Sequence, residues 1–295
     1  MNIQNYYRKA TVAEVEFYQS KLYPLQDKVF EIASVYDDRI YLTGGTALSR
    51  FYYQHRLSED LDFFTITNDL QIIANDLAAR LRSAGEAQNL IVEIERIEPY
   101  FAKFFVVTND CRLKIEFVRE FNHVGELIRT EQGIYINNLE DMGANKISAF
   151  EDRAEIKDVI DLYFITQTLS LEHLFELTDI KRVPVAYERL LTINAQGIQG
   201  NALTLVELNS VELSHFLETL KQRTEAEVKK KVERITENIQ PVIDKLLWDF
   251  PHERRIVSPY SYSVVKRRMQ RSPLPERLAL EKLLSNYQQG KHDSN

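Results

Sequence analysis

The chain has 295 residues, which is long enough for one large domain or two modest ones, each with an apolar core. Hydrophobic residues make up 44% and charged residues 27%, a composition that excludes a disordered chain and predicts a globular one. The net charge of −7 argues against nucleic-acid binding by the surface as a whole, so only a local basic patch would support that function.

The N-terminal residues 1–17 mix polar, charged and aromatic side chains and lack the apolar core of a signal peptide. All apolar runs are far shorter than the roughly 20 residues that cross a bilayer. The single cysteine, Cys111, excludes an internal disulfide and a cysteine-based zinc site, in keeping with a reducing compartment. We therefore expect a cytoplasmic protein that does not associate with membranes.

The first half of the chain mixes helix and strand patterns. Apolar residues at mostly helical spacing predict helices at 11–36, 46–56 and 69–85. Short apolar runs predict strands within 37–45 and at 61–67. Further β-rich runs, with the partial alternation of a sheet covered on one face, lie at 89–98, 100–108 and 111–120.

Beyond about residue 138 the pattern is helical. The expected helices lie at 139–151, 155–168, 182–193 and 210–249. The sequence therefore predicts an α+β fold, in which a mixed sheet with flanking helices (residues 1–138) is followed by an all-helical domain (residues 139–295).

The most informative stretch begins where a strand ends at Gly44-Gly45-Thr46 and a helix follows. This arrangement gathers backbone N–H groups and the positive end of a helix at one point, which is typical of a phosphate site. The glycines let phosphate oxygens approach the main chain closely, and the Thr46 hydroxyl is a further donor. Taken alone, a Gly pair between strand and helix is more often only a turn.

Two carboxylates follow this helix, in Asp60-Leu61-Asp62 at the start of the next strand. Strand alternation places Asp60 and Asp62 on one face, where like charges repel unless a cation joins them. Mg²⁺ fits such a pair, because it prefers carboxylates together with phosphate oxygens. Glu116 is the candidate for a third metal ligand; alternatively, it and Lys114 only form the solvent face of their strand. The acids and the glycine turn together predict two-metal phosphoryl transfer.

These residues together resemble the opening motif of the AbiEii/AbiGii abortive-infection toxins, a nucleotidyltransferase family of the polymerase-β-like superfamily. The matching elements are GGTAL, Tyr-x-x-His-Arg and Ser-x-Asp-Leu-Asp-Phe-Phe, with 13 residues between Thr46 and Asp60. The resemblance implies a polymerase-β-like fold and Mg²⁺-dependent transfer of a nucleotidyl group from an NTP, with release of pyrophosphate. It also implies the role of a toxin in a toxin–antitoxin or phage-defence system, with a cognate antitoxin encoded nearby. The candidate acceptor is tRNA, and proteins and small molecules are the alternatives.

The resemblance covers residues 35–170 and includes the motif that contains Glu116, where the superfamily usually has Asp. The residues that it assigns to the nucleotide pocket, besides the glycine turn, are Lys114, Lys146, Arg153 and Asp158. For Asp158 and Asp161, the alternative is a structural role in salt bridges that pack their helix. The last 120 or so residues show no assignable motif, and we expect acceptor choice to lie there.

Two basic features leave alternatives open. Arg56, just before the paired acids, either contacts phosphate in the nucleotide site or pairs with Glu59 or Asp60. Residues 252–272 hold six Arg or Lys against one Glu, with two tyrosines between them. This basic segment either binds a nucleic-acid backbone and stacks on bases or is only a solvated face.

Two other functions compete with NMP transfer to tRNA. A small-molecule nucleotidyltransferase, similar to antibiotic-modifying members of the superfamily, would need a compact acceptor pocket and no basic segment. The other alternative is a domain that binds nucleotide or RNA without turnover. It is suggested by Glu116, because the superfamily usually has Asp at this position. Motifs of P-loop, dinucleotide-binding, zinc-protease and serine-hydrolase sites do not occur in the sequence.

Overall fold

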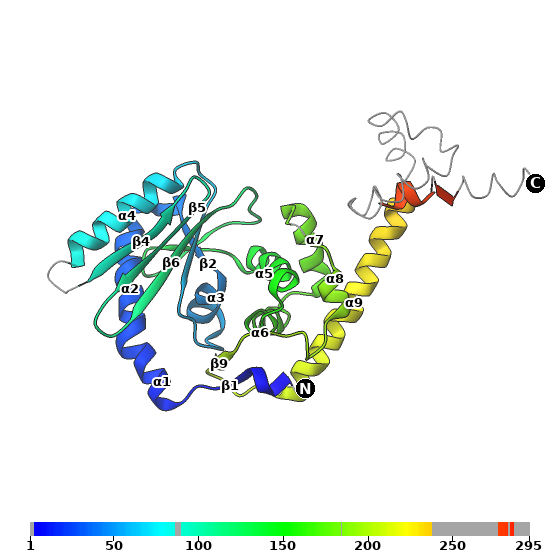
Figure 1. Ribbon diagram of the computed structural model, residues 1–295, viewed down its shortest axis with the longest axis horizontal. Helices are drawn as coiled ribbons and strands as arrows, with labels where there is room; N and C mark the ends of the chain where they lie inside the picture. Colours follow the sequence, from blue (N-terminus) through cyan, green and yellow to red (C-terminus); the bar gives the residue numbers. More distant parts are fainter. Residues whose placement is uncertain (1–2, 86–89, 184, 238–276, 283, 286–295) are drawn as a thin grey trace, which may run out of the picture. The chain divides into compact units, whose positions relative to one another are not determined.

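Figure 1 shows the computed structural model, which describes residues 3–85, 90–183, 185–237, 277–282 and 284–285. Residues 1–224 form one compact unit, and residues 225–295 belong to a second. The described residues of the second unit are the end of α9 (Ser210–Glu237) and the helical residues 277–282 and 284–285. In the described part of the chain, no helix is long and apolar enough to span a membrane.

The first unit is built on a seven-stranded mixed sheet in the order β4-β5-β6-β3-β2-β8-β7. Its strands are β2 (Tyr41–Thr43), β3 (Leu61–Thr65), β4 (Ile91–Ile97), β5 (Phe101–Val107), β6 (Arg112–Arg119), β7 (Ile128–Arg129) and β8 (Tyr135–Ile136). β3 is parallel to β6 on one side and antiparallel to β2 on the other. A parallel pair, β1 (Tyr7–Lys9) and β9 (Ala202–Thr204), forms a second sheet. The predicted α+β fold is confirmed.

One face of the large sheet is apolar and buried. β5 and β6 alternate buried with less buried residues, as a sheet covered on one face requires. On this face the ring of Phe117 stacks at 5.3 Å from Phe63 and at 6.1 Å from Phe104, between ring centroids. All three rings are almost fully buried, and truncating such a ring to Ala costs about 3–5 kcal/mol. The opposite face carries Asp62 and Glu116.

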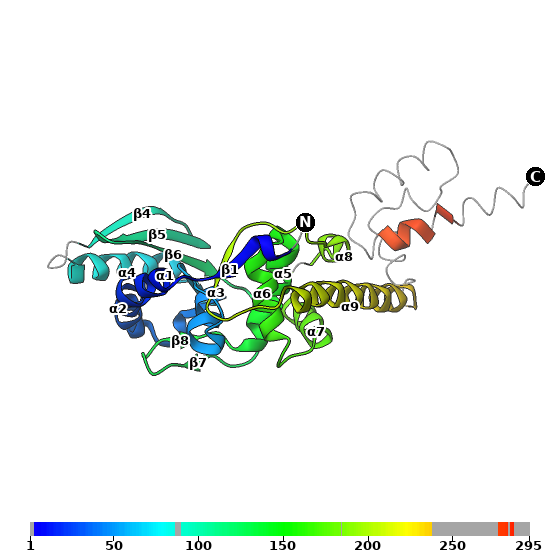
Figure 2. The same cartoon turned by 90° about the horizontal axis from the view of Figure 1, so that it is seen from below.

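Helices α2 (Tyr23–Ala33) and α4 (Leu70–Gly85) pack against each other, and α4 contacts β4, β5 and β6 on the apolar face (Figure 2). The N-terminal helical segment begins with α1 (Val12–Phe17), where Thr11 and Glu14 form a capping box. It continues through a π-helical stretch (Tyr18–Leu22), α2 and a 3₁₀ stretch (Ser34–Arg39). The predicted helices 11–36 and 69–85 are confirmed.

Helices follow the sheet along the chain. They are α5 (Leu139–Arg153), α6 (Ile156–Ile165), α7 (Leu171–Lys181) and α8 (Glu188–Thr192). The predicted helices at 139–151 and 155–168 correspond to α5 and α6. α5 contacts α6, α7 and α8, so these helices form one cluster beside the sheet (Figure 1).

Of the described residues in the predicted helix 182–193, only α8 (Glu188–Thr192) is helical, so the prediction is wrong for the residues before it. The preceding helix, α7, ends at Lys181, and Arg182 takes a left-handed conformation with φ 58°. α7 is capped by Ser170, whose side chain accepts a hydrogen bond from the His173 backbone N–H. Pro184 disfavours helix at the residue before it, which explains why only the short α8 falls in the predicted range.

Lys181 ties α7 to the sheet and to α5. Its side chain is 2% exposed, and its ammonium pairs with Glu120, at 2.5 Å, and with Asp141. The Tyr41 hydroxyl donates to the other oxygen of Glu120, and the Asn137 amide donates to Asp141. These buried carboxylates therefore have both a counter-charge and hydrogen-bond donors, which buried charges require.

The predicted domain boundary near residue 138 falls between β8 and α5. β8 ends at Ile136 and α5 begins at Leu139, so the change from sheet to helix occurs there. Residues on both sides of this point belong to the same compact unit. The division into a catalytic domain and a helical domain therefore stays a prediction.

We expect Lys181→Met to lower the free energy of unfolding by about 3–5 kcal/mol, because it leaves two buried carboxylates without their cation. Urea denaturation followed by circular dichroism measures this loss. Lys21→Met is the control, since Lys21 pairs with Asp110 on the surface and such a pair contributes about 0–1 kcal/mol. Equal losses in the two variants would contradict a role for the buried cluster.

Candidate active site

The turn between β2 and α3 (Gly44–Ala47) requires both of its glycines. Gly44 has φ +69°, and a Cβ there would lie 2.6 Å from Oδ2 of Asp62. A Cβ at Gly45 would lie 2.3 Å from a guanidinium nitrogen of Arg56. The missing side chains thus let a carboxylate and a guanidinium lie directly against the turn.

The register of the sheet brings the acids together. In the parallel pair β3–β6, Asp62 is the partner of Glu116, and Asp60 directly precedes β3. The ammonium of Lys114 lies between two of them, 3.0 Å from Asp60 Oδ2 and 3.0 Å from Glu116 Oε2. Burial lowers the pKa of Lys114, but its hydrogen bonds to the two acids outweigh this effect and the pKa is raised.

Asp62 is in an unfavourable environment for a carboxylate. Burial, with the negative charges of Asp60 and Glu116, raises its pKa to about 6, although Lys114 and Lys146 act in the opposite direction. No hydrogen bond from a described residue reaches its carboxylate oxygens. Asp62 therefore carries a destabilising charge at neutral pH, which an additional cation would relieve.

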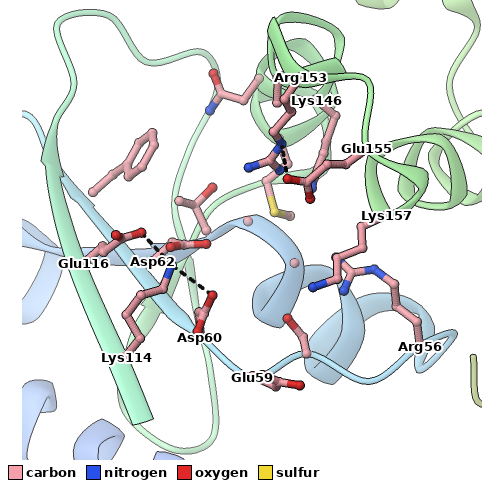
Figure 3. A pocket seen from close by; sticks show the side chains of 18 residues that line it. Arg56, Glu59, Asp60, Asp62, Lys114, Glu116, Lys146, Arg153, Glu155 and Lys157 are labelled. Carbon is pink, nitrogen blue, oxygen red and sulfur yellow. Dashed lines mark hydrogen bonds and ion pairs between the residues drawn. The ribbon is translucent and has the colours of Figure 1, made fainter. Parts of the chain in front are cut away.

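A cationic wall faces the acids across the pocket, formed by Arg56, Lys146, Arg153 and Lys157 (Figure 3). Lys146 Nζ lies 2.8 Å from Asp158 and 2.6 Å from Asp161. Arg153 makes two hydrogen bonds to Asp158, of 2.8 and 2.9 Å. The two buried aspartates hold these cations side by side, as the salt-bridge alternative for Asp158 and Asp161 predicts. Burial lowers the pKa of Lys146, but Asp158 and Asp161 outweigh it and the pKa is raised.

Arg56 pairs with neither Glu59 nor Asp60, so that alternative is wrong. Its Nε and Nη2 donate to both oxygens of Asp161, at 2.7 and 2.8 Å, while its guanidinium lines the pocket. His55, which the sequence did not single out, also contacts Asp161, with 2.7 Å between Nε2 and Oδ1. Burial lowers the pKa of His55, so a neutral imidazole donates from Nε2 to the carboxylate.

Two predicted residues lie behind the pocket lining. Thr46 is 1% exposed, and its hydroxyl contacts the Asp60 carbonyl oxygen at 2.5 Å and the Ser58 hydroxyl at 2.9 Å. Asp158 is fully buried beneath Lys146 and Arg153. Their nucleotide-binding roles stay predictions; in this structure Thr46 positions the Asp60 backbone and Asp158 positions cations.

The pocket has a volume of about 320 Å³, within the size range of small-molecule sites. It is lined by the predicted Gly44, Gly45, Arg56, Asp60, Asp62, Lys114, Glu116, Lys146 and Arg153. The lining residues that the sequence did not single out include Phe64, Met142, Asn145, Ala149, Glu155 and Lys157. Strand alternation from Asp62 points to Phe64, and helical spacing from Lys146 points to Met142, Ala149 and Arg153.

The acids fit a divalent cation of the Mg²⁺ type, which prefers carboxylate oxygens. The Lys114 ammonium shows that a positive group is stable between Asp60 and Glu116. Across the described residues, no group of three or more His, Cys, Asp or Glu is arranged as a ready metal cluster. A cation could occupy the position between Asp60 and Glu116 only if the Lys114 ammonium moved away from it.

The family that matches this chain gives its class: the chain is a nucleotidyltransferase. Residues 29–252 match the family described as "Nucleotidyl transferase AbiEii toxin, Type IV TA system". The chain therefore belongs to the AbiEii family of nucleotidyltransferase toxins, which its motifs predicted. No match was found among curated proteins.

The solved structures that are similar to this chain include two bacterial proteins. MenT4, a nucleotidyltransferase toxin from Mycobacterium tuberculosis H37Rv, is 17% identical, with a TM-score of 0.51 over 69% of this chain and 82% of that one. JHP933 from Helicobacter pylori is 21% identical, with a TM-score of 0.45 over 72% of this chain and 95% of that one. The likeness to MenT4 shows that the two chains share a fold.

We expect Asp62→Asn, without divalent metal, to raise the free energy of unfolding by about 1–2 kcal/mol at pH 8. The folded pKa, about 6, lies above that of an unfolded Asp, about 3.9, so this carboxyl lowers stability as the pH rises from about 4 to about 6. At pH 4 the folded state is protonated and the unfolded state is about half protonated, so the difference is small. Urea denaturation at the two pH values measures this, with the exposed Asp38→Asn as control; a loss of stability at pH 8 would contradict it.

We also expect Lys114→Met to raise the affinity for Mn²⁺ without NTP by about tenfold, because it removes the cation that competes for Asp60 and Glu116. Isothermal titration calorimetry measures the affinity, with Lys21→Met as the control. Unchanged or weaker Mn²⁺ binding would show that Lys114 does not occupy the position of the ion.

Proposed function

We propose that this protein transfers an NMP from an NTP to an acceptor hydroxyl, with Mg²⁺ as cofactor and pyrophosphate as the leaving group. The observation that carries the proposal is a single pocket in which carboxylates and cations face each other beside the Gly44-Gly45 turn. An NTP needs both, because its phosphates bind cations of the protein while its metal ions bind carboxylates.

The residues that would hold Mg²⁺ are Asp60, Asp62 and Glu116. The metal would supply activation of the attacking hydroxyl and stabilisation of the charge that develops on the phosphates. Deprotonation of Asp62 is favoured when a cation is bound beside it, because that cation offsets the burial that raises its pKa. Lys114, displaced from the acids, can then donate to a phosphate oxygen.

The phosphates would bind between the glycine turn and the cationic wall. The absence of Cβ atoms at Gly44 and Gly45 gives phosphate oxygens access to the backbone, as at other phosphate-binding turns. The four cations Arg56, Lys146, Arg153 and Lys157 outnumber the three carboxylates beside them, Asp158, Asp161 and Glu155. The excess attracts an anion, and because the aspartates fix the cations, little further ordering is needed on binding.

We propose tRNA as the acceptor and a toxin role that a cognate antitoxin neutralises, acting in the cytoplasm where NTPs are available. Membership of a type IV toxin–antitoxin family supports the toxin role. The basic segment 252–272 supports an RNA acceptor through its sequence alone, because it lies outside the described residues.

We expect wild-type protein, incubated with each α-labelled NTP, Mg²⁺ and total tRNA, to label an RNA band. Asp60→Ala/Asp62→Ala should reduce the labelling at least about 100-fold, because the phosphate charge is then not stabilised. Gel separation identifies the base used and the acceptor class together.

Asp38→Ala/Asp110→Ala is the charge-matched control, since both carboxylates are exposed and outside the pocket. Label in a small molecule rather than RNA would favour the antibiotic-type alternative. The absence of label with every NTP and with cell lysate, while NTP still binds, would favour the non-catalytic alternative.

A further inference from the structure

The two ends of the pocket differ in chemistry. One end is cationic, with Arg56, Arg153 and Lys157 near the Gly45 turn. The other end contains Phe64, Met142 and Asn145, which carry no charge. Asp62 and Glu116 line the same pocket, so a nucleotide bound there can contact the acids, the cations and the uncharged residues.

Helix α5 runs along the pocket and separates these ends. Asn145 and Arg153 both line the pocket and are eight residues apart, which is about 12 Å along the helix axis. The two side chains also face different groups. Arg153 bonds to Asp158 of α6, whereas the Asn145 amide is directed to Glu120, just after β6. Arg153 and Asn145 therefore line different parts of the pocket, and Lys146, which directly follows Asn145, lies between them on the helix.

Phe64 supplies an apolar surface at the uncharged end. It lies two residues beyond Asp62 on the same face of β3, and its ring is only partly buried. The Tyr41 ring packs edge-on against it, with 6.3 Å between centroids, and the buried Met142 lines the pocket nearby. An aromatic ring of this kind stacks on any nucleobase, because every base has a π-face.

Asn145 supplies a single oriented polar group at this end. Its Nδ2 faces two carboxylates, Asp141 at 3.4 Å and Glu120 at 3.5 Å, which can only accept hydrogen bonds. This contact fixes the amide, and its Oδ1 accepts no hydrogen bond from any described residue. The free oxygen is an acceptor that the pocket offers to a ligand.

We propose that Phe64, Met142 and Asn145 form the nucleobase subsite, in which Asn145 Oδ1 accepts a hydrogen bond from an exocyclic amino group of the base. The group that Asn145 would recognise is N6 of adenine or N4 of cytosine; guanine, whose amino group is at N2, and uracil carry a keto oxygen at the equivalent position. The site therefore selects ATP and CTP over GTP and UTP. This inference rests on the proposed function, because it takes the ligand to be an NTP.

The test is isothermal titration calorimetry of the full chain with each NTP and with inorganic tripolyphosphate, in the presence of Mg²⁺ and without acceptor. We expect wild type to bind ATP and CTP about tenfold more tightly than GTP and UTP. Asn145→Leu should weaken ATP and CTP about tenfold and leave the other two within about threefold. Phe64→Ala should weaken all four NTPs by a similar factor, about tenfold.

Tripolyphosphate binding shows that each variant is folded and should not change, since neither Phe64 nor Asn145 carries a charge that binds phosphate. Asn75→Leu, which replaces an exposed amide on α4, is the matched control for Asn145→Leu. Equal binding of the four NTPs by wild type, or equal loss of all four in Asn145→Leu, would overturn base selection by Asn145. Loss of tripolyphosphate binding in Phe64→Ala would overturn the position of the base.

The two proposals fail in different ways. If the affinity for NTPs depends on the base but no acceptor is labelled, the nucleobase subsite is supported, and nucleotidyl transfer to the acceptors tried is refuted. Transfer of label with base-independent binding would refute the subsite alone. If Phe64→Ala does not fold, Phe64→Leu replaces it, because this variant keeps an apolar side chain but cannot stack on a base. We expect the same weakening of all four NTPs, and loss of tripolyphosphate binding would again overturn the position of the base.

Discussion

The carboxylate of Asp161 holds together three parts of the chain on which the pocket depends. It accepts two hydrogen bonds from Arg56 and pairs with Lys146 and His55, although Arg56 is 105 residues away in the sequence. Without it, the two cations would repel each other next to the glycine turn. Removing one partner of a buried ion cluster typically costs about 3–5 kcal/mol, so the docking of α6 and the shape of the turn depend on the same contact.

Asp60, Asp62 and Glu116, in contrast to Asp161, are not fully compensated by neighbouring cations. Three carboxylates share one region of the sheet, and of these Asp62 has no hydrogen bond from a described residue and a pKa raised to about 6. Such a site lowers the stability of the chain but increases the benefit of binding a cation, as in other sites where function costs stability. In the protein without a bound metal, Lys114 reduces this loss of stability, because its ammonium pairs with Asp60 and Glu116. A divalent cation that binds these acids would displace it.

The sequence was sufficient to predict the local parts of this site. The glycine turn, Asp60 and Asp62 follow from motif spacing, and Glu116 follows from strand alternation beside Lys114. The partner of Arg56 was not predictable, because a contact over 105 residues has no local pattern. The sequence analysis predicted no helix at α7 (Leu171–Lys181), although Ser170 is a common local signal for the start of a helix.

The position of the cations bears on how the chain is organised. The sheet, with the acids and the glycine turn, precedes residue 138, whereas Lys146, Arg153 and Asp161 follow it. Neither part contains a complete pocket, because acids without the facing cations would repel a triphosphate and cations without the acids would bind no metal. A chain division at residue 138 can therefore describe a change in secondary structure, but the functional unit must include both α5 and α6.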